Sequence, residues 1–229
     1  SYTAMVRVSM AGTNIISGRY NATTEMFLQT RTVIVAPAPP DYLAVTGNAT
    51  QMAGASQNIT ITAYDVFNNV AVDYDGNYVH TFSGANPSPA PSSWPTIAGV
   101  IMDGVNTVTL SFTDGVCSNV PMVLYKVETA HITTTDGSLD ADDHKLDVSV
   151  SHAATNYFTV TGSGTQTAGT SQTITVSAFD AYNNPATGYA GSHDLTFDGA
   201  GATAALPPSP AYTPTVAAIE FGTATPMTF

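Results

Sequence analysis

The chain has 229 residues, of which 43% are hydrophobic and only 10% are charged. Seventeen acidic residues against five basic ones give a formal net charge of −12. This charge argues against nucleic acid and anionic membranes as partners, because both need a basic face on the protein. Thr, Val, Ser, Ala, Gly and Asn are frequent whereas Leu, Lys and Glu are scarce, which predicts a β-sheet protein with many turns.

Three further features of the sequence limit the class of protein. Cys117 is the single cysteine, so an intrachain disulfide framework and a cysteine-clustered zinc site are excluded, and we expect Cys117 to fill the core. No run of about 18 apolar residues occurs, so the sequence predicts no membrane-embedded segment. The chain begins at Ser1 without a basic stretch followed by an apolar one, from which we expect a processed product or a fragment.

The sequence repeats itself after 115 residues, and this repeat decides its organisation. The motif Ala-Gly-x-Ser-Gln-x-Ile-Thr-(Ile/Val)-x-Ala-(Tyr/Phe)-Asp-x-(Phe/Tyr)-Asn-Asn occupies residues 53–69 and recurs at residues 168–184. The correspondence runs without a gap through residues 42–82 and 157–197. Chance does not produce so long a match, so the chain contains parts of at least two equivalent domains.

Segments before the first repeat resemble the end of a repeat. Met5–Val8 is similar to Met122–Tyr125, and Thr32–Val35 is similar to Asp147–Val150. The second pair stands just before a repeat begins in both places. The first forty residues therefore read as the closing strands of a domain whose opening half is not in the sequence.

The last repeat is incomplete in the opposite sense, because with a gap of two residues the final Met227–Phe229 aligns with Leu110–Phe112, in the middle of a repeat. We predict a C-terminal half-domain in residues 1–40, a complete domain in residues 41–155 and an N-terminal half-domain in residues 156–229. The two halves together have 114 residues against a period of 115, so residues 1–40 of a neighbouring copy would complete residues 156–229. Two arrangements stay open, namely separate subunits that associate head to tail and one long polypeptide.

Apolar and polar residues alternate along the complete repeat, as in strands with one buried face. The predicted strands are residues 42–46, 58–63, 78–83, 97–102, 107–112, 122–129 and 146–150. Turn-forming residues separate them, as at residues 65–69, 86–95, 103–104 and 136–137. This pattern predicts an all-β fold of tandem immunoglobulin-like (Ig-like) β-sandwich domains. The residues expected to face the cores are Ile59, Ile61, Val108, Leu110, Phe112, Val148 and Val150, with Ile174, Val176 and Phe197 in the next domain.

The repeated motif resembles the opening of bacterial Ig-like repeats of the invasin and intimin type. In that family the pattern usually runs Asp-x-x-Gly-Asn-Pro, whereas this sequence has Asn68 and Asn183 in place of the Gly. Asn is the next best residue at positive φ, so the same turn can form. The resemblance implies tandem Ig-like domains stacked in a large surface or secreted protein, with a stalk or scaffold role and no catalytic residues.

Two groups of acidic residues are candidates for calcium. Asp65 and Asp180 are each followed by paired Asn, but one carboxylate per loop favours an Asx-type turn over a metal site. The candidate metal site is a denser stretch with four carboxylates, namely Asp136, Asp140, Asp142 and Asp143. This stretch lacks the Asp-x-Asp-x-Asp-Gly order of a dedicated calcium loop, so a solvated acidic loop is the simpler interpretation and no cofactor is required.

The sequence offers no constellation of catalytic residues. HExxH, Gly-x-Ser-x-Gly, P-loop and Rossmann patterns are all missing from it. The five histidines show no spacing typical of metal ligands, and we expect most of them on the surface or in the sheets. The sequence therefore predicts a protein that is not an enzyme.

We expect an extracellular or cell-surface structural protein that forms a stalk, fibre or filament through head-to-tail contacts with copies of itself. The alternative is an adhesin or carbohydrate-binding module that binds glycans. It is suggested by Trp94, which stands in the Pro-rich loop 86–95, where an aromatic ring can stack on sugars. Glycosylation stays open at three Asn-x-Ser/Thr sequons, which begin at Asn21, Asn48 and Asn58.

Overall fold

The computed structural model describes residue 3 and residues 5–19, 28–89, 92–167, 173–196, 216–221 and 227–228. The chain divides into two compact units, the first made of residues 1–88 and 92–151 and the second of residues 89–91 and 152–229. Both are built from strands, so the predicted all-β class is confirmed. Within the ranges described, the helical structure is the short 3-10 helix η1, Asp142–His144, and no helix there has the length and apolarity needed to cross a membrane.

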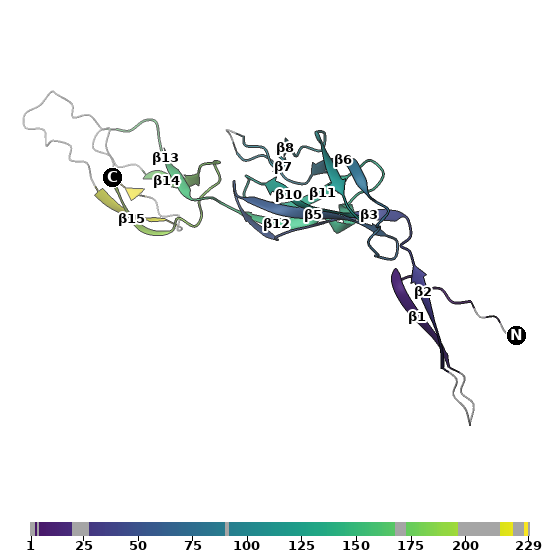
Figure 1. Ribbon diagram of the computed structural model, residues 1–229. Coiled ribbons are helices and arrows are strands. Elements are labelled where there is room, and N and C mark those ends of the chain that lie inside the picture. The colour runs from purple at the N-terminus through teal and green to yellow at the C-terminus, as the bar shows by residue number, and fades with distance from the viewer. Residues whose placement is uncertain are drawn as a thin grey trace, which may run out of the picture. The chain divides into compact units, whose positions relative to one another are not determined.

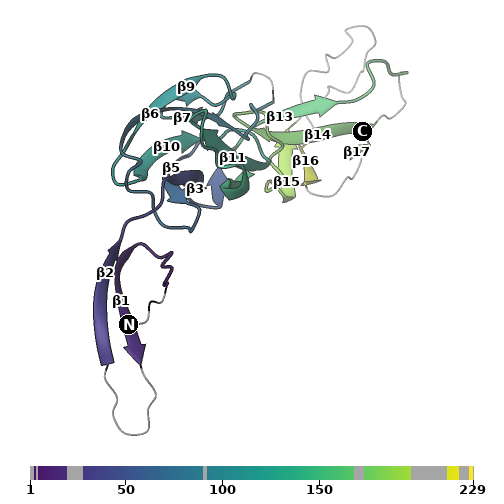
Figure 2. The same cartoon turned by 90° about the vertical axis from the view of Figure 1, so that its right-hand side faces the viewer.

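The first unit opens with a two-stranded hairpin and continues with ten strands. The hairpin pairs β1, Gly12–Arg19, antiparallel with β2, Leu28–Val35 (Figure 2). The strands that follow are β3, Pro40–Thr46; β4, Thr50–Met52; β5, Ser56–Asp65; β6, Gly76–Ser83; β7, Thr96–Ile97; β8, Val100–Ile101; β9, Thr107–Phe112; β10, Val116–Val123; β11, Thr129–Thr135; and β12, Leu146–Ser151.

These ten strands form two five-stranded sheets in a sandwich-like arrangement (Figure 1). One sheet has the order β3-β5-β10-β7-β8 and the other has the order β4-β12-β11-β6-β9. Neighbouring strands are antiparallel except β4 and β12, which run parallel with Thr50 beside Ser149. Because β3 and β4 follow each other in the sequence but join different sheets, the start of the domain is bonded to both sheets.

The core of the first unit forms from the residues that the alternation predicts. The buried members of the predicted set are Ile59, Ile61, Leu110, Phe112, Val148 and Val150. Val108 is only half-buried, because β9 is the edge strand of its sheet. Cys117 is buried as expected, and burial raises the pKa of its thiol.

Two predicted strands have the wrong boundaries. Residues 97–102 do not form one strand, because the chain reverses between β7 and β8 through Ala98 and Gly99, both at positive φ. Residues 122–129 contain the end of β10 and the beginning of β11. A single strand is impossible there, since β10 and β11 belong to different sheets and the chain crosses between them.

The second unit repeats the opening strands of the first. Its strands are β13, Thr155–Thr161; β14, Thr173–Asp180; β15, Gly191–Thr196; β16, Val216–Phe221; and β17, Met227–Thr228. Strand β13 pairs with β14 as β3 pairs with β5, and β15 pairs with β16 as β6 pairs with β9. Of the core residues predicted here, Ile174 and Val176 are half-buried and Phe197 lies outside the described residues.

The structure corrects the alignment of the last residues of the chain. Strand β16 takes the place predicted for Met227–Phe229, because Gly191 pairs with Phe221 as Gly76 pairs with Phe112. Strand β17 instead pairs with β14, where β10 lies beside β5 in the first unit. The prediction failed because the second repeat has fewer residues between β15 and β16 than the first has between β6 and β9, whereas the predicted gap gave it more.

A histidine lies in the core of the first unit, which the sequence did not predict. His80 is fully buried, and its ring stacks on Phe112 with the centroids 5.4 Å apart. The Thr134 hydroxyl donates to the carbonyl oxygen of Thr81, so it accepts from His80 Nδ1, 3.2 Å away. Nε2 has no hydrogen-bond partner among the described residues. Burial lowers the pKa of His80, against a smaller upward effect from Asp136.

Truncation of a core residue should destabilise the first unit strongly. Ile61→Ala removes a side chain with 0% exposure and should cost about 2 to 5 kcal/mol of unfolding free energy, because a cavity remains between the sheets. Urea unfolding followed by circular dichroism measures this loss. Val79→Ala, at an exposed position of β6, is the control and should cost less than about 0.5 kcal/mol. Equal losses in the two variants would show that the assignment of the core face is wrong.

His80 should make the stability depend on pH. Because its pKa is lower in the folded state, stability is full above the unfolded-state value of about 6.5 and declines as the pH falls below it. The slope from one proton is at most about 1.4 kcal/mol per pH unit. His80→Phe keeps a ring against Phe112 and should remove this slope in urea titrations between about pH 7.5 and 5.5. A variant with the slope of the wild type would contradict the assignment.

Candidate functional site

The loop that follows β5 is organised by one carboxylate. Asp65 Oδ1 accepts hydrogen bonds from the backbone N–H of Phe67 and of Asn69, both at 2.8 Å. Asn68 between them has a φ of 63°, the left-handed conformation predicted from its place in the motif. These bonds confirm the Asx-type turn that the sequence predicts for Asp65.

The other oxygen of Asp65 binds chain outside the loop. Oδ2 accepts the side-chain N–H of Asn69 at 2.9 Å and the backbone N–H of Ala38 at 2.8 Å. Ala38 lies between β2 and β3, so the carboxylate fixes the segment by which the chain enters the sandwich. Asp65 is fully buried, which opposes ionisation, but the hydrogen bonds from Asn69, Ala38 and Phe67 outweigh burial and lower the pKa of its carboxyl.

Asn69 extends the same attachment to the segment before β1. Its Oδ1 accepts the backbone N–H of Ala11 at 2.9 Å, and its Nδ2 donates to the carbonyl oxygen of Ser9 at 2.8 Å. The Arg7 guanidinium lies 5.3 Å from the centroid of the Phe67 ring, within the range of a cation–π contact. The loop therefore holds both ends of the hairpin, at residues 7–11 and at Ala38.

The second unit has the same loop 115 residues later. Asp180 Oδ1 accepts the backbone N–H groups of Tyr182 and Asn184, and Oδ2 accepts Asn184 Nδ2 and the backbone N–H of Ala153, all within 2.8–2.9 Å. Asn183 has a φ of 64°. Asp180 is buried, and the hydrogen bonds outweigh the effect of burial and lower the pKa of its carboxyl. Ala153 corresponds to Ala38 in the repeat, so the same atoms bind the same part of the entering chain in both units.

Aromatic residues brace both loops in the same manner. The rings of Tyr42 and Tyr64 stack with centroids 5.3 Å apart, and the Tyr42 hydroxyl donates to Asn68 Oδ1 at 2.9 Å. In the second unit Tyr157 stacks on Phe179 at 5.5 Å and donates to the side chain of Asn183. The entry strand of each unit is thereby attached to its loop at a second point.

One difference between the loops is a histidine that takes the place of Pro37. His152 Nε2 accepts the backbone N–H of Gly188 at 2.9 Å, so the proton of its neutral ring lies on Nδ1, which donates to the Ala153 carbonyl oxygen at 2.7 Å. A Cβ on Gly188 would lie 2.9 Å from Nε2, which is too close. A side chain at position 188 would therefore displace the His152 ring from this contact.

Three of the four acidic residues predicted as a metal site accept hydrogen bonds from other groups of the protein. Asp136 accepts a hydrogen bond from the Tyr74 hydroxyl at 2.6 Å. Burial raises the pKa of the Asp136 carboxyl, but the hydrogen bonds from Tyr74 and from the backbone N–H groups of Leu139 and Ser138 outweigh it and lower that pKa. The Asp140 carboxylate accepts a hydrogen bond from the backbone N–H of Asp142, and the Asp142 carboxylate accepts one from the Thr133 hydroxyl. The side chain of Asp143 is exposed. Among the described residues no three His, Cys, Asp or Glu side chains gather closely enough to hold a metal ion, and calcium here stays a prediction.

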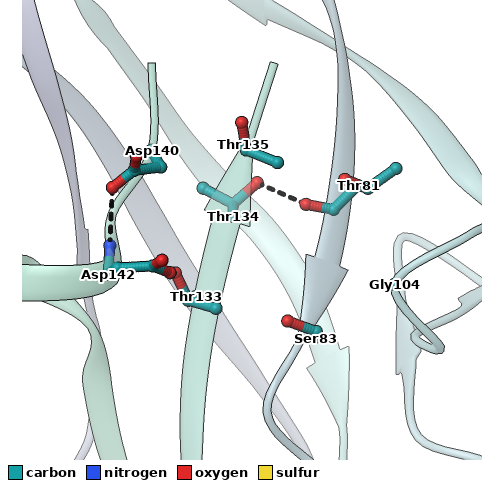
Figure 3. Close-up of a pocket in the computed structure, with 8 residues that line it drawn as sticks. All are labelled: Thr81, Ser83, Gly104, Thr133, Thr134, Thr135, Asp140 and Asp142. Carbon is teal, nitrogen blue, oxygen red and sulfur yellow. Dashed lines mark hydrogen bonds between the residues drawn. The ribbon is translucent and has the colours of Figure 1, made fainter. Parts of the chain in front are cut away.

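Two of these carboxylates line a shallow hollow of about 340 Å³. Asp140 and Asp142 form one side, Thr81 and Ser83 of β6 form the other, and the threonines of β11 lie between them (Figure 3). Its lining is polar, and its hydroxyl and carboxylate groups already bond to one another in part. Trp94, the predicted sugar-binding residue, is not part of this hollow and lies 44% exposed in its own loop.

The sequence did not reveal which chain segments the aspartate loops would bind. The only signal was the exact recurrence of the second Asn, at Asn69 and Asn184, whose side chains complete the bonds to the carboxylates. Of the three sequons, Asn48 and Asn58 are exposed and Asn21 lies outside the described residues. Glycosylation at these positions stays a prediction.

Removal of the Asp65 carboxylate should release the hairpin from the sandwich. In Asp65→Ala the backbone N–H groups of Ala38, Phe67 and Asn69 lose their acceptor, so their amide hydrogen exchange should accelerate and the melting temperature should fall. Asp103→Ala is the matched control, because Asp103 accepts N–H groups only within its own exposed turn. Unchanged exchange at Ala38 in Asp65→Ala would refute the role given to the carboxylate.

The calcium prediction has a direct test. If the acidic stretch of Asp136, Asp140, Asp142 and Asp143 holds calcium, the ion should raise the melting temperature of the first unit and EDTA should lower it. Asp142→Asn should abolish both responses. Asp114→Asn, at an exposed turn outside the acidic stretch, should leave them unchanged. A wild-type protein whose melting ignores EDTA rejects the site.

Comparison with known proteins assigns no family. No protein-family model matches the chain, and no curated protein sequence matches it. The functional argument therefore starts from the internal repeat and from the geometry of the two aspartate loops.

Proposed function

We propose that the chain is a non-catalytic, extracellular structural protein, in which Ig-like β-sandwich domains follow one another head to tail in a stalk, fibre or filament. The observation that carries the proposal is the recurrence of the aspartate loop. Asp65 and Asp180 each bind the backbone of the segment that enters their own domain, through equivalent atoms. The aspartate loop joins successive parts of the chain and recurs with each domain. Such a loop suits a protein that holds its domains at a fixed spacing.

The strand order of residues 40–151 supports the Ig-like part of the proposal. The order β3-β5-β10-β7 corresponds to strands A, B, E and D of an Ig-like domain, and β12-β11-β6 corresponds to G, F and C. Strand β9 extends the second sheet beside β6, as an added strand does in variable-type domains. One departure is that β7 and β8 precede β9 in the sequence, so the chain visits the first sheet before it completes the second.

The attachment of the entering segment supports a spacer role on energetic grounds. Fixing the backbone of one free linker residue costs about 1 to 2 kcal/mol of conformational entropy, as TΔS at room temperature. A spacer with a defined direction has to restrict this freedom, so bonds that hold the linker are needed. Here Asp65 fixes Ala38, while Asn69 fixes Ser9 and Ala11, so the segments on both sides of the hairpin are bonded to one loop. The low charge and acidic balance of the surface are compatible with a secreted protein of this type.

The extracellular fibre can be tested on cells of the source organism. Antibodies raised against residues 40–151 should label the outside of intact cells and extended filaments released from them, seen by immunogold electron microscopy. An antibody to a cytoplasmic protein of the same cells is the control for leakage. Labelling that appears only after permeabilisation, or that never coincides with extended particles, contradicts the proposal.

The exposure of Trp94 favours a second candidate, an adhesin or carbohydrate-binding module. An indole ring that is 44% exposed in a Pro-rich loop can stack on a sugar. A glycan array probed with the wild type and with Trp94→Ala separates the candidates. Binding that the substitution abolishes supports the adhesin, whereas an absence of binding by both leaves the structural role as the proposal.

A further inference from the structure

We propose that the hairpin β1–β2 of one copy of the chain covers the exposed apolar face of β13 in the second unit of another copy. The contact would reproduce the one that β11 and β12 make with β3 inside the first unit. The inference rests on the proposed head-to-tail fibre and specifies the surfaces that would join its subunits.

The receiving surface is defined by a difference between equivalent residues. Leu43 and Val45 of β3 are 0% and 3% exposed, and β3 lies alongside β11 and β12. Phe158 and Val160 hold the same positions in β13 but are 39% and 58% exposed. The second unit therefore presents, on its entry strand, an apolar face that the first unit covers with its last two strands.

Among the described residues of the second unit, the exposed large apolar side chains lie on β13. Near the Asp180 loop, Ala178 and Ala186 are buried, just as Ala63 and Ala71 are near the Asp65 loop. Exposure appears along β13 as it runs away from that loop, since Thr155 pairs with Asp180 whereas Val160 pairs with Val176. The described residues at the loop end of the unit are thus buried as in the first unit, and the exposed face begins where β11 and β12 lie in the first unit.

The hairpin carries the residues that this face lacks. Val33 and Val35 of β2 correspond by the 115-residue period to Val148 and Val150 of β12, which are buried in the first unit. The pairing within the hairpin follows the same plan, because Val33 pairs with Asn14 as Val148 pairs with Ala130.

One further pair completes the apolar face of the hairpin. Arg31 pairs with Ile16 as Leu146 pairs with Ile132, so Ile16 stands where the buried Ile132 stands in β11. Ile16 and Val33 are only half-buried in the hairpin. Arg31 in the place of Leu146 leaves a charge on this face, so the contact would be more polar at that corner than its counterpart.

The topology of the first unit favours another copy over the same chain. The hairpin is attached at the Asp65 loop, where Pro40 of β3 pairs with Asp65. The chain leaves the first unit after Ser151, which pairs with Met52 at the far end of the run formed by β3 and β4. The hairpin and the point where the chain leaves the first unit therefore lie at opposite ends of this run, and a hairpin from a second copy is free of that constraint.

Sedimentation velocity on two complementary variants tests the contact. Val33→Asp disables the hairpin and Val160→Asp disables the face, so each alone should sediment as a 23.7 kDa monomer, whereas the wild type should form larger species as its concentration rises. An equimolar mixture should form a heterodimer and nothing larger, because each partner keeps one working surface. Ile34→Asp is the matched control, since Ile34 is 82% exposed on the opposite face of β2 and its substitution should leave the assembly intact.

The outcomes separate this inference from the proposed function. Assemblies that survive both Val33→Asp and Val160→Asp overturn the contact while leaving a fibre in place, and loss of assembly in Ile34→Asp alone shows that the opposite face of the hairpin binds. A wild type that stays monomeric at every concentration also overturns it, and the labelling of intact cells then judges the structural function separately. Melting curves of the variants should retain the transition of the first unit, whose core contains none of the substituted residues.

Discussion

The start of the first domain depends on the hydrogen bonds that the ionised carboxylate of Asp65 accepts. This carboxylate is fully buried, and a buried charge is stable only where hydrogen bonds replace its water. Four N–H groups from Phe67, Asn69 and Ala38 supply that replacement. The turn after β5, the left-handed conformation of Asn68 and the course of the chain before β3 must therefore form together. A partly assembled loop would leave the charge without donors, so intermediate geometries are disfavoured.

The two units show that an alternating pattern fixes which face of a strand is apolar and not whether that face is buried. Strands β3 and β13 have the same alternation, yet Leu43 is inaccessible to solvent and Phe158 is not. The difference comes from strands far away in the sequence, because β11 and β12 lie against β3. Burial in a β-sandwich is a non-local property, and this is why side-chain propensity in strands depends so much on context.

Much of the fold could be predicted from the sequence, because strands with one buried face leave a period of two in the residues. Ile59 and Ile61 were placed in the core by that period alone, and the turn at Asp65 by its motif. The reversal of the chain between β7 and β8 could not be predicted from the sequence, because strands of two residues are too short to show any period. The alignment of the last residues failed where the repeat changes length, and only the pairing of β16 with β15 reveals the register.

The candidate site was less accessible to the sequence than the fold. The carboxylates of the aspartate loops could be recognised by their motif, but their bonds to Ala38 and Ala153 connect residues 27 positions apart and follow from tertiary packing. The burial of His80 could not be predicted either. Histidine occurs on both the buried and the exposed face of a strand, so its position in the alternation does not tell which face it occupies. Four acidic residues close together in the sequence suggested a shared ligand, whereas in the structure Asp136 accepts the Tyr74 hydroxyl, Asp142 accepts the Thr133 hydroxyl and Asp140 accepts the backbone N–H of Asp142.

The parallel pairing of β4 with β12 places a strand near the start of the domain beside its closing strand. If tension acts on the two ends of the domain, it draws β4 back toward its beginning and β12 forward toward its end, so the two strands are sheared past each other. The bonds from Ser149 N–H to the Ala49 carbonyl oxygen and from Ala53 N–H to the Ser151 carbonyl oxygen lie across that direction. They share the load and must break together, not one after another as when a hairpin is unzipped. Resistance to pulling is then set by the rate of one concerted rupture, which gives the domain a mechanical strength that its equilibrium stability does not measure.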